Sequence, residues 1–420
     1  RILLLDEPVS QLDPVCTWEF MNLLKKVRED FGLTILVAEH NLDLFLPEAD
    51  KVIYMENGRI NYQGKKDLFI RKMFQEEKKF VESLPETVKL YHEAGGTEEW
   101  PFTAATLIKA LNQEQRKVLF PEDLELEDSR GGQEVILIRG GYFRYEKNSR
   151  DILRDLDLSL YSGRIYGLIG GNGAGKSTAI KLILGLCRAD EGSIRVFGHE
   201  SKELPETLRQ EIGVSLAESG FSGELTVNDV KHILKKMYHS FDENYFIKQS
   251  ENLKLPMNKK IKEFSTGMKA KLRVLTAMTH HAKLLIMDEP TAGLDVEARN
   301  EILDMLRAYI AEDESRSILI TSHISTDLES LCDELYLIHD GKLILHEATD
   351  AILEQYGILK VSEEQYRTLD QSSILKVQKE NYGYACFTND KKFYQENYPQ
   401  IAVENGGIDE LILMMTGGYR

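Results

Sequence analysis

A glycine-rich stretch near the middle of the chain carries residues whose types and spacing could bind phosphate. Residues 170–177 read GGNGAGKS, which fits the pattern G-x-x-x-x-G-K-[ST]. The apolar run at 164–169 predicts a strand before this stretch, and residues 178–186 predict a helix after it. In that setting the backbone N–H groups can close around phosphate oxygens at the positive end of the helix dipole. The sequence therefore predicts a phosphate-binding loop, and the alternative is a glycine-rich turn with a surface lysine.

Such a loop needs a cation for the phosphates and an oxygen ligand for a metal ion. Lys176 is predicted to reach the β- and γ-phosphates of a nucleotide, and Ser177 to offer its hydroxyl to Mg²⁺. The residues that we expect to contact the nucleotide here are Gly170, Asn172, Gly173, Gly175, Lys176, Ser177 and Thr178.

Acidic and histidine side chains follow two further apolar runs, which are typical of buried strands. Asp288 ends the run LLIMD and is predicted to hold Mg²⁺ through a water molecule. Glu289 comes next and is predicted to polarise the water that attacks the γ-phosphate; an acidic cap on a strand end is the alternative. His323 follows SILITS and is predicted to contact the γ-phosphate, unless it is a structural histidine. The predicted catalytic residues are thus Lys176, Glu289 and His323, and the predicted metal ligands are Ser177 and Asp288.

Part of the sequence occurs twice. Residues 1–14 read RILLLDEPVSQLDP and residues 283–295 read KLLIMDEPTAGLD. Asp6 and His40 lie 282 and 283 residues before their counterparts, so the copies keep their register to within one residue. Each copy then continues into a predicted hairpin with an Asn-Gly or Asp-Gly turn. A repeat of this length predicts two related domains, and the start at Arg1 beside an apolar run predicts that the first copy is cut off before its beginning.

These motifs and their spacing resemble the ATP-binding-cassette (ABC) ATPases over the full length of the second copy. Residues 264–268 read FSTGM, a variant of the family's signature segment, which in the family caps the γ-phosphate of the opposite subunit. The resemblance implies Ser265 and Gly267 for that contact, with a simple helix cap as the alternative. Asp295 matches the family's D-loop. Tyr145 lies where the family places an aromatic residue that stacks on adenine, and a core strand aromatic is the alternative.

One element departs from the family pattern. The segment IGVSLAESGF should contain the Q-loop glutamine, which in the family contacts Mg²⁺ and water and relays movement to the membrane partner. By register this position falls on Ala217, with Glu218 beside it. Either Glu218 takes over the role after a shift of one residue, or it is a solvated loop carboxylate.

The two copies resemble different branches of the family. The second copy and the residues after it resemble the ATPases of ABC-2-type exporters, whereas the first copy resembles the energy-coupling-factor ATPases. In the first copy the Walker B, D-loop and H-loop positions match Asp6, Glu7, Asp13 and His40, but this chain contains no phosphate loop, signature or Q-loop for it. Two explanations remain open: the partial domain is functional, or it is a product of recombination or sequence assembly.

The predicted fold is α/β, with a P-loop NTPase domain of the ABC type, its helical subdomain, and a partial second domain before it. We expect a truncated ABC ATPase domain at 1–75 and a helical, solvated linker at 76–133. A complete ABC ATPase domain is expected at 134–350 and a small α+β appendage at 351–420.

Composition narrows the classes of function. The chain has 420 residues and a formal net charge of -17, which argues against a scaffold that mainly binds nucleic acid. Its apolar runs are too short to span a bilayer, which needs about 20 residues. The four cysteines lie far apart and form no metal-type pair. We expect a cytoplasmic protein, peripheral on the inner face of the cell membrane.

The resemblance implies an ATP-binding and ATP-hydrolysing subunit of an ABC transporter. MgATP would drive its dimerisation, as a homodimer or a heterodimer with a second ABC ATPase, and separate membrane-spanning subunits would carry the substrate. No nucleic-acid partner is expected. The alternatives are a soluble ABC ATPase that acts on ribosomes or DNA, and a degenerate nucleotide-binding regulator that does not turn over. The sequence implies neither the cargo nor the direction of transport.

Overall fold

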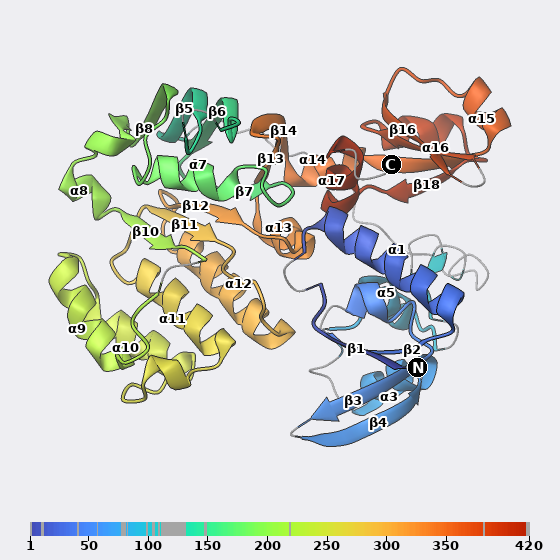
Figure 1. The fold of residues 1–420 in the computed structure, drawn as a ribbon, viewed down its shortest axis with the longest axis horizontal. Coiled ribbons are helices and arrows are strands. Elements are labelled where there is room, and N and C mark those ends of the chain that lie inside the picture. The colour runs from blue at the N-terminus through green and yellow to red at the C-terminus, as the bar shows by residue number, and fades with distance from the viewer. Residues whose placement is uncertain are drawn as a thin grey trace.

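The structure is a computed structural model of the chain (Figure 1). It describes residues 2–9, 12–39, 42–56, 58–76, 81, 83–97, 100–102, 106–107, 110, 132–146, 149–217, 220–380 and 383–416. None of the helices in these ranges is long and apolar enough to cross a membrane.

The second copy of the repeat is built on a six-stranded sheet. Its strands lie in the order β10 (Ile212–Ser215), β11 (Leu284–Asp288), β12 (Ser317–Thr321), β7 (Ile165–Ile169), β13 (Glu334–His339) and β14 (Lys342–Ala348). The first five are parallel, and β14 runs antiparallel at the edge. Every residue of β7, β11 and β12 is buried, as expected for parallel strands that are covered on both faces. The carboxyl ends of these three neighbouring strands therefore meet at one edge of the sheet.

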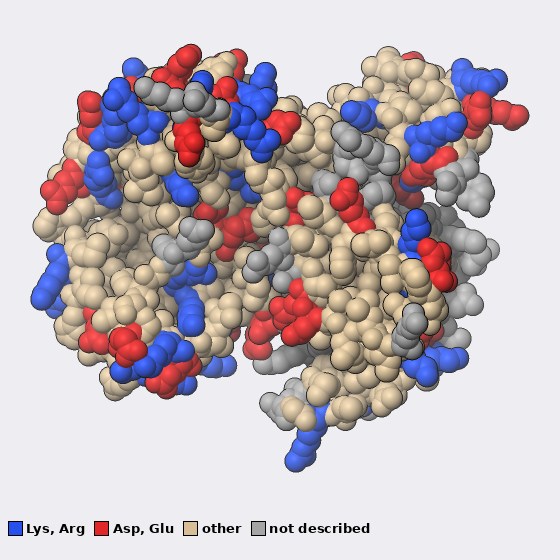
Figure 2. Space-filling model, in the orientation of Figure 1, with Lys and Arg blue, Asp and Glu red and all other residues tan. Residues whose placement is uncertain are grey.

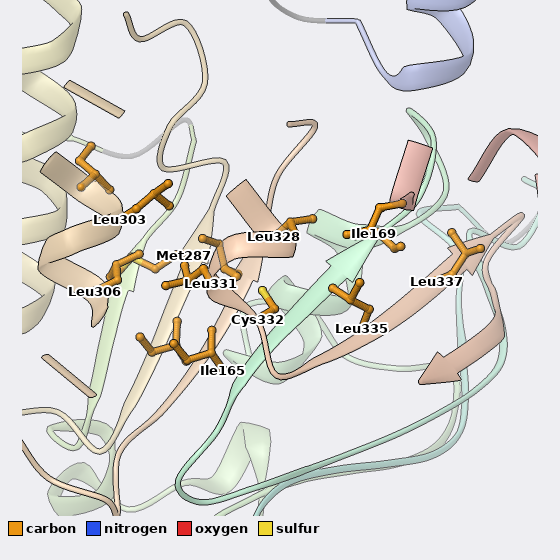
Figure 3. Close-up of a cluster of buried hydrophobic side chains, with 14 of the residues drawn as sticks. Ile165, Ile169, Met287, Leu303, Leu306, Leu328, Leu331, Cys332, Leu335 and Leu337 are labelled. Carbon is orange, nitrogen blue, oxygen red and sulfur yellow. The ribbon is translucent and has the colours of Figure 1, made fainter. Parts of the chain in front are cut away.

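Helices that follow these strands cover the sheet. They are α7 (Lys176–Ile183), α12 (Val296–Ala311), α13 (Ser325–Leu331) and α14 (Thr349–Gln355). Leucines at helical spacing on α12 and α13 pack against apolar side chains of the sheet, as Figure 3 shows for Leu303, Leu306, Leu328, Leu331, Met287 and Ile169. This cluster fixes α12 and α13 beside the edge at which the strands end.

An antiparallel sheet and a helical subdomain complete the second copy. The antiparallel sheet has the order β6 (Leu153–Tyr161), β5 (Glu134–Phe143), β8 (Glu191–Val196) and β9 (His199–Glu200), followed by the short helices η1 (Ser201–Glu203) and α8 (Glu206–Arg209). The helical subdomain consists of α9 (Val227–Met237), α10 (Glu243–Asn252), η2 (Ile261–Glu263) and α11 (Thr266–Met278). It has a core of its own around Phe246 and Leu275. The predicted α/β fold with a P-loop and a helical subdomain is confirmed.

The first copy repeats the local design of the second. It consists of β1 (Ile2–Asp6), α1 (Pro14–Phe31), β2 (Thr34–Ala38), α2 (Leu42–Phe45), β3 (Lys51–Glu56) and β4 (Arg59–Lys65). β1 and β2 pair in parallel, as β11 and β12 do, and β3 and β4 form a hairpin with a register shift, as β13 and β14 do. One face of β1 is open, because Ile2 and Leu4 are 72% and 68% exposed, whereas β11 is buried throughout.

Part of the predicted linker packs as a hydrophobic core. The prediction of a solvated segment at 76–133 is therefore wrong for Leu84, Val88, Tyr91, Trp100 and Leu107, which are buried. α3 (Lys66–Glu76) and α5 (Glu86–Glu93) bring their apolar faces together. The buried side chains of this cluster are Leu46, Phe69, Ile70, Met73, Leu84, Val88, Tyr91, Trp100 and Leu107. The high content of Glu and Lys in this stretch concealed the apolar residues, which helical spacing gathers on one side.

The C-terminal segment forms a four-stranded antiparallel sheet with helices. The order is β16 (Ile374–Glu380), β17 (Gly383–Thr388), β15 (Gly357–Val361) and β18 (Ala402–Asn405), with α15 (Glu363–Thr368), α16 (Lys391–Asn397) and α17 (Ile408–Thr416) beside it. α17 does not belong to this segment alone, because Ile408, Leu411 and Ile412 share the main cluster with Leu328 of α13. Figure 1 shows α17 next to α1 of the first copy as well. The end of the chain thus contributes to the core beside the central sheet.

We expect Tyr91→Ala to destabilise the first copy, because Tyr91 is 4% exposed and lies edge-on to Trp100 at 6.0 Å between ring centroids. Removing a buried aromatic side chain lowers the free energy of unfolding by about 3–5 kcal/mol. Denaturant unfolding followed by tryptophan fluorescence measures the effect, because Trp100 remains as a reporter. Leu90→Ala on the same helix is the control, since Leu90 is exposed. Equal stabilities of the two variants would contradict the packed core.

Candidate functional site

The glycine-rich loop lies between β7 and α7 and depends on glycine for its shape. Gly170, Gly173 and Gly175 have φ values of 148°, 76° and 112°, a region that side chains disfavour. A Cβ atom at Gly170 would lie 2.2 Å from the carbonyl oxygen of Ile338, and one at Gly175 would lie 2.6 Å from Leu153 Cδ2. The loop is therefore closed against β13 and β6, and its N–H groups precede the first turn of α7.

Lys176 is the first residue of α7 and is buried. Its Nζ donates to the carbonyl oxygens of Gly170 at 2.6 Å and Gly171 at 3.2 Å. Burial lowers the pKa of Lys176, and the nearby carboxylate of Glu289 opposes that change. The ammonium thus lies inside the loop, where phosphate oxygens would be stronger acceptors than neutral carbonyls.

Ser177 and Asp288 meet across the edge of the sheet. Ser177 Oγ lies 3.4 Å from Asp288 Oδ1, and Thr321 Oγ1 donates to the same oxygen at 2.7 Å. A hydroxyl and a carboxylate are hard oxygen ligands that suit Mg²⁺, which keeps several positions for water and phosphate. In the described ranges no group of three His, Cys, Asp or Glu side chains is placed to hold a metal ion. Sequence reasoning missed Thr321, whose one signal is a hydroxyl at a strand end.

Glu289 follows Asp288 in a left-handed turn, with a φ of 52°. Its N–H group donates to Thr321 Oγ1 at 3.0 Å, and its Oε2 accepts from the His323 N–H at 3.3 Å. Burial raises the pKa of Glu289 to about 7; Lys176 opposes this shift, and the charge of Asp288 adds to it. The carboxyl group therefore exchanges its proton near neutral pH, as a general base should.

His323 faces Glu289. Its Nε2 atom lies 3.1 Å from Glu289 Oε1. Burial lowers the pKa of His323 to about 4, and the positive charge of Lys176 adds to the effect. The imidazole is therefore neutral at physiological pH, and the structure brings together the three residues that the sequence predicted as catalytic.

The predicted signature residues begin a helix. Ser265 is the N-cap of α11, and its Oγ accepts from the N–H group of Met268 at 3.2 Å. Gly267 lies against α12, because a Cβ atom there would be 3.3 Å from that of Ala298. Asp295 caps α12 by accepting from the Ala298 N–H at 2.8 Å. The structure thus places Ser265 and Gly267 at the first turn of a helix, where free N–H groups are suited to an anion.

Comparison with known proteins places this site in a family. A family model described as "ABC transporter" matches residues 153–292. Over 354 residues the chain is 31% identical to a putative ABC transporter ATP-binding protein of Bacillus thuringiensis subsp. konkukian. That alignment covers 83% of this chain and 63% of the relative. Over 209 residues it is 32% identical to the ABC transporter ATP-binding protein YtrB of Bacillus subtilis, and this alignment covers 50% of this chain and 71% of YtrB. The chain belongs to the ABC transporter ATP-binding proteins.

Other ABC relatives match over a shorter range. The chain is 33% identical over 195 residues to the bacitracin transport ATP-binding protein BcrA of Enterococcus faecalis, and this alignment covers 46% of this chain and 63% of BcrA. It spans about 63% of the length of the Bacillus thuringiensis relative. The predicted membership of the ABC family is confirmed.

The first copy of this ABC protein touches the phosphate loop, which sequence reasoning did not predict. Asp13 Oδ2 accepts from the backbone N–H of Asn172 at 2.7 Å, and Oδ1 accepts from that of Cys16 at 2.8 Å. Burial works to raise the pKa of Asp13, but these N–H donors outweigh it, and the pKa is lowered. The signal in the sequence is the equivalence of Asp13 with Asp295, since each caps the helix after its Asp-Glu-Pro turn.

A second point of contact lies at the signature segment. A pocket of about 460 Å³ has Glu7 of the first copy on one side and Ser265, Gly267 and Asp295 of the second copy on the other. Glu7 corresponds to Glu289 in the repeat and shares its left-handed backbone, with a φ of 43°. The first copy therefore presents its own Asp-Glu-Pro turn to the signature of the second.

Four further predicted positions have different outcomes. Tyr145 is 58% exposed, so it is no core aromatic, and its hydroxyl lies 3.3 Å from Thr178 Oγ1. The carbonyl oxygen of Ala217 accepts from Arg273 Nη1 at 2.9 Å. Glu218 and His40 lie outside the described residues.

We expect Glu289→Gln to stabilise the fold at pH 8 but not at pH 4. The folded-state pKa of about 7 lies above the usual value of 4.5, so the stability contributed by this carboxyl group is lost as the pH rises between these values. The neutral amide avoids that loss, on the order of 1–3 kcal/mol in the free energy of unfolding. Denaturant titrations at both pH values measure it, with the exposed Glu314→Gln as the control. A stability difference independent of pH would contradict the buried carboxylate.

Proposed function

We propose that this chain binds and hydrolyses MgATP as the nucleotide-binding subunit of an ABC transporter. One observation carries the proposal: Lys176, Ser177, Asp288, Glu289 and His323 converge at the carboxyl edge of three adjacent buried strands. Membership of the ABC family supports it, and so do the names of the relatives, which describe transport ATP-binding proteins.

The proposed reaction is in-line attack of water on the γ-phosphorus of ATP, with ADP as the leaving group. Mg²⁺, when bound by Ser177 and, through water, by Asp288, would neutralise charge on the β- and γ-phosphates. The N–H groups from Gly170 to Thr178 and the ammonium of Lys176 hold the phosphates. Glu289 takes the proton from water, because its pKa of about 7 suits a base at neutral pH. Neutral His323, whose Nε2 lies 3.1 Å from Glu289 Oε1, contacts the γ-phosphate.

We propose that Tyr145 and the signature residues of one chain contact two different nucleotides. The exposed ring of Tyr145 beside Thr178 is available to stack on adenine. Ser265 and Gly267 sit at a helix start that suits a γ-phosphate, but they line a pocket that contains none of the phosphate-loop residues. They would therefore cap a nucleotide held by the phosphate loop of another chain, because the first copy supplies no phosphate loop in this chain.

The contacts of Asp13 and Glu7 support pairing between the two copies within one chain. Asp13 lies on the phosphate loop of the second copy, and Glu7 lies opposite its signature. The sequence alone favoured a partner signature from another molecule, as a homodimer or heterodimer, and that arrangement remains the alternative. In both arrangements the face that carries the phosphate loop is an interface between ABC units.

We propose that membrane-spanning subunits dock beside the Q-loop position. A pocket of about 340 Å³ there has apolar walls from Phe221, Ile261 and Leu272, with Lys269 and Arg273 at its rim. Arg273 also holds the loop through the carbonyl oxygens of Leu216 and Ala217, so pressure on the pocket would reach this loop. The protein would then lie on the inner face of the membrane.

The soluble and regulatory alternatives have less support. A protein that acts on ribosomes or DNA would need a basic surface, whereas Lys and Arg are interspersed with Asp and Glu on the face in Figure 2. A regulator without turnover would not need a base, whereas Glu289 is buried with a raised pKa beside the phosphate loop.

We expect Glu289→Gln to keep ATP affinity and to slow hydrolysis by about 10²–10⁴, the usual contribution of a general base. Lys176→Ala should instead weaken ATP binding, because the buried ammonium is the cation of the loop. Equilibrium titration and steady-state phosphate release separate the two effects, with Lys181→Ala on the same helix as the control. Near-normal turnover of Glu289→Gln would remove this residue from the proposed role.

Pairing within one chain predicts a specific disulfide. A Cβ atom at Gly171 would lie 3.5 Å from Asp13 Oδ2, so Asp13→Cys and Gly171→Cys together should cross-link under mild oxidation. Cys16→Ser is added because Cys16 is exposed on the same helix turn. Non-reducing electrophoresis should show a single-chain species at every protein concentration, and Asp13→Cys without Gly171→Cys should show none. A cross-link found only between two chains would support the homodimer instead.

A further inference from the structure

A buried polar network lies directly behind the turn that carries Glu289. Thr291 Oγ1 donates to Asp327 Oδ2 at 2.7 Å, and Arg299 Nε lies 3.1 Å from Asp327 Oδ1. Thr291 is fully buried and Asp327 is 1% exposed. A carboxylate at this depth costs free energy unless it is paired, so its two partners are needed to keep it there.

The network joins three elements that border the site. Thr291 belongs to the turn after β11, Arg299 to the first turns of α12, and Asp327 to α13. α13 begins two residues after His323, so the position of this helix sets where the imidazole lies.

The first copy lacks this network although it forms the same turn. In the register of the repeat, Thr291 and Arg299 correspond to Val9 and Thr17, and Asp327 corresponds to Leu44. Val9 is buried, and Glu7 keeps the left-handed backbone of Glu289 with a φ of 43°. In the first copy the backbone N–H of Val9 donates instead to Glu39 Oε1 at 3.4 Å, so the turn forms without a counterpart of Asp327. The distinct effect of the polar set is to tie the turn and α12 to α13.

We propose that Asp327 is a positioning residue: through Thr291 and Arg299 it fixes α13 against the Glu289 turn and holds His323 beside Glu289. This proposal rests on the proposed ATP hydrolysis at that pair. It gives a role to a buried ionic set of a kind that apolar residues can often replace without loss of stability.

The test transfers the residues of the first copy into the second. The variant Thr291→Val/Arg299→Thr/Asp327→Leu should keep its melting temperature and its ATP affinity. Its kcat should fall by about 10- to 100-fold, the usual result of a misplacement near 1 Å. Amide hydrogen exchange should become faster at 289–293 and 322–326 and stay unchanged elsewhere. A kcat close to that of the unmodified chain would overturn the proposal.

Two further variants keep the result decisive. If the triple variant does not fold, Asp327→Asn is used instead, because it preserves the shape of the side chain and removes its charge. We expect a lower kcat at unchanged ATP affinity for this variant. An unchanged kcat overturns the proposal. Glu312→Gln is the control, because it removes the ion pair with Arg316 at the far end of α12. If the unmodified chain does not hydrolyse ATP, the proposed function fails, and hydrogen exchange alone decides the role of Asp327: unchanged exchange at 322–326 overturns it.

Discussion

The parallel pairing of β11, β12 and β7 is the constraint on which the site depends. Asp288 pairs with Thr321, and Ile320 pairs with Gly167, so the three strands end at one level. All three are buried on both faces, and a slip in register would expose apolar side chains or bury polar ones. The loop after β7, the acidic pair after β11 and the histidine after β12 are therefore brought together by the sheet before any side chain interacts.

Charge balance at this edge explains how the site is prepared for chemistry. One buried ammonium, Lys176, stands among the carboxylates of Asp13, Asp288 and Glu289. Burial disfavours the charge of Lys176 and raises the pKa of Glu289 to about 7. A bound nucleotide would add negative phosphate charges at this edge of the sheet, and its metal ion would add positive charge. Nucleotide binding would therefore change the pKa of Glu289.

Local patterns in the sequence predicted the residues of the site, whereas long-range packing did not follow from them. The phosphate loop was predictable because its glycines and Lys176 lie within eight positions between a strand and a helix. Asp288, Glu289 and His323 were predictable because each follows an apolar run, and the resemblance to ABC ATPases then implied the signature and D-loop. The contact of Asp13 with Asn172 joins residues 159 positions apart, and the partners of Asp327 come from two other elements. The core around Trp100 was missed because charged residues surround its apolar positions in the sequence.

A structure of the chain with Mg²⁺ and a non-hydrolysable ATP analogue tests the central claim most directly. The account predicts the β- and γ-phosphates inside the loop from Gly170 to Ser177. Lys176 Nζ should leave the carbonyl oxygens of Gly170 and Gly171 for phosphate oxygens, and the metal ion should lie between Ser177 and Asp288, with Glu289 facing the γ-phosphate. An analogue bound away from this loop, or a metal ion that neither Ser177 nor Asp288 approaches, would contradict it.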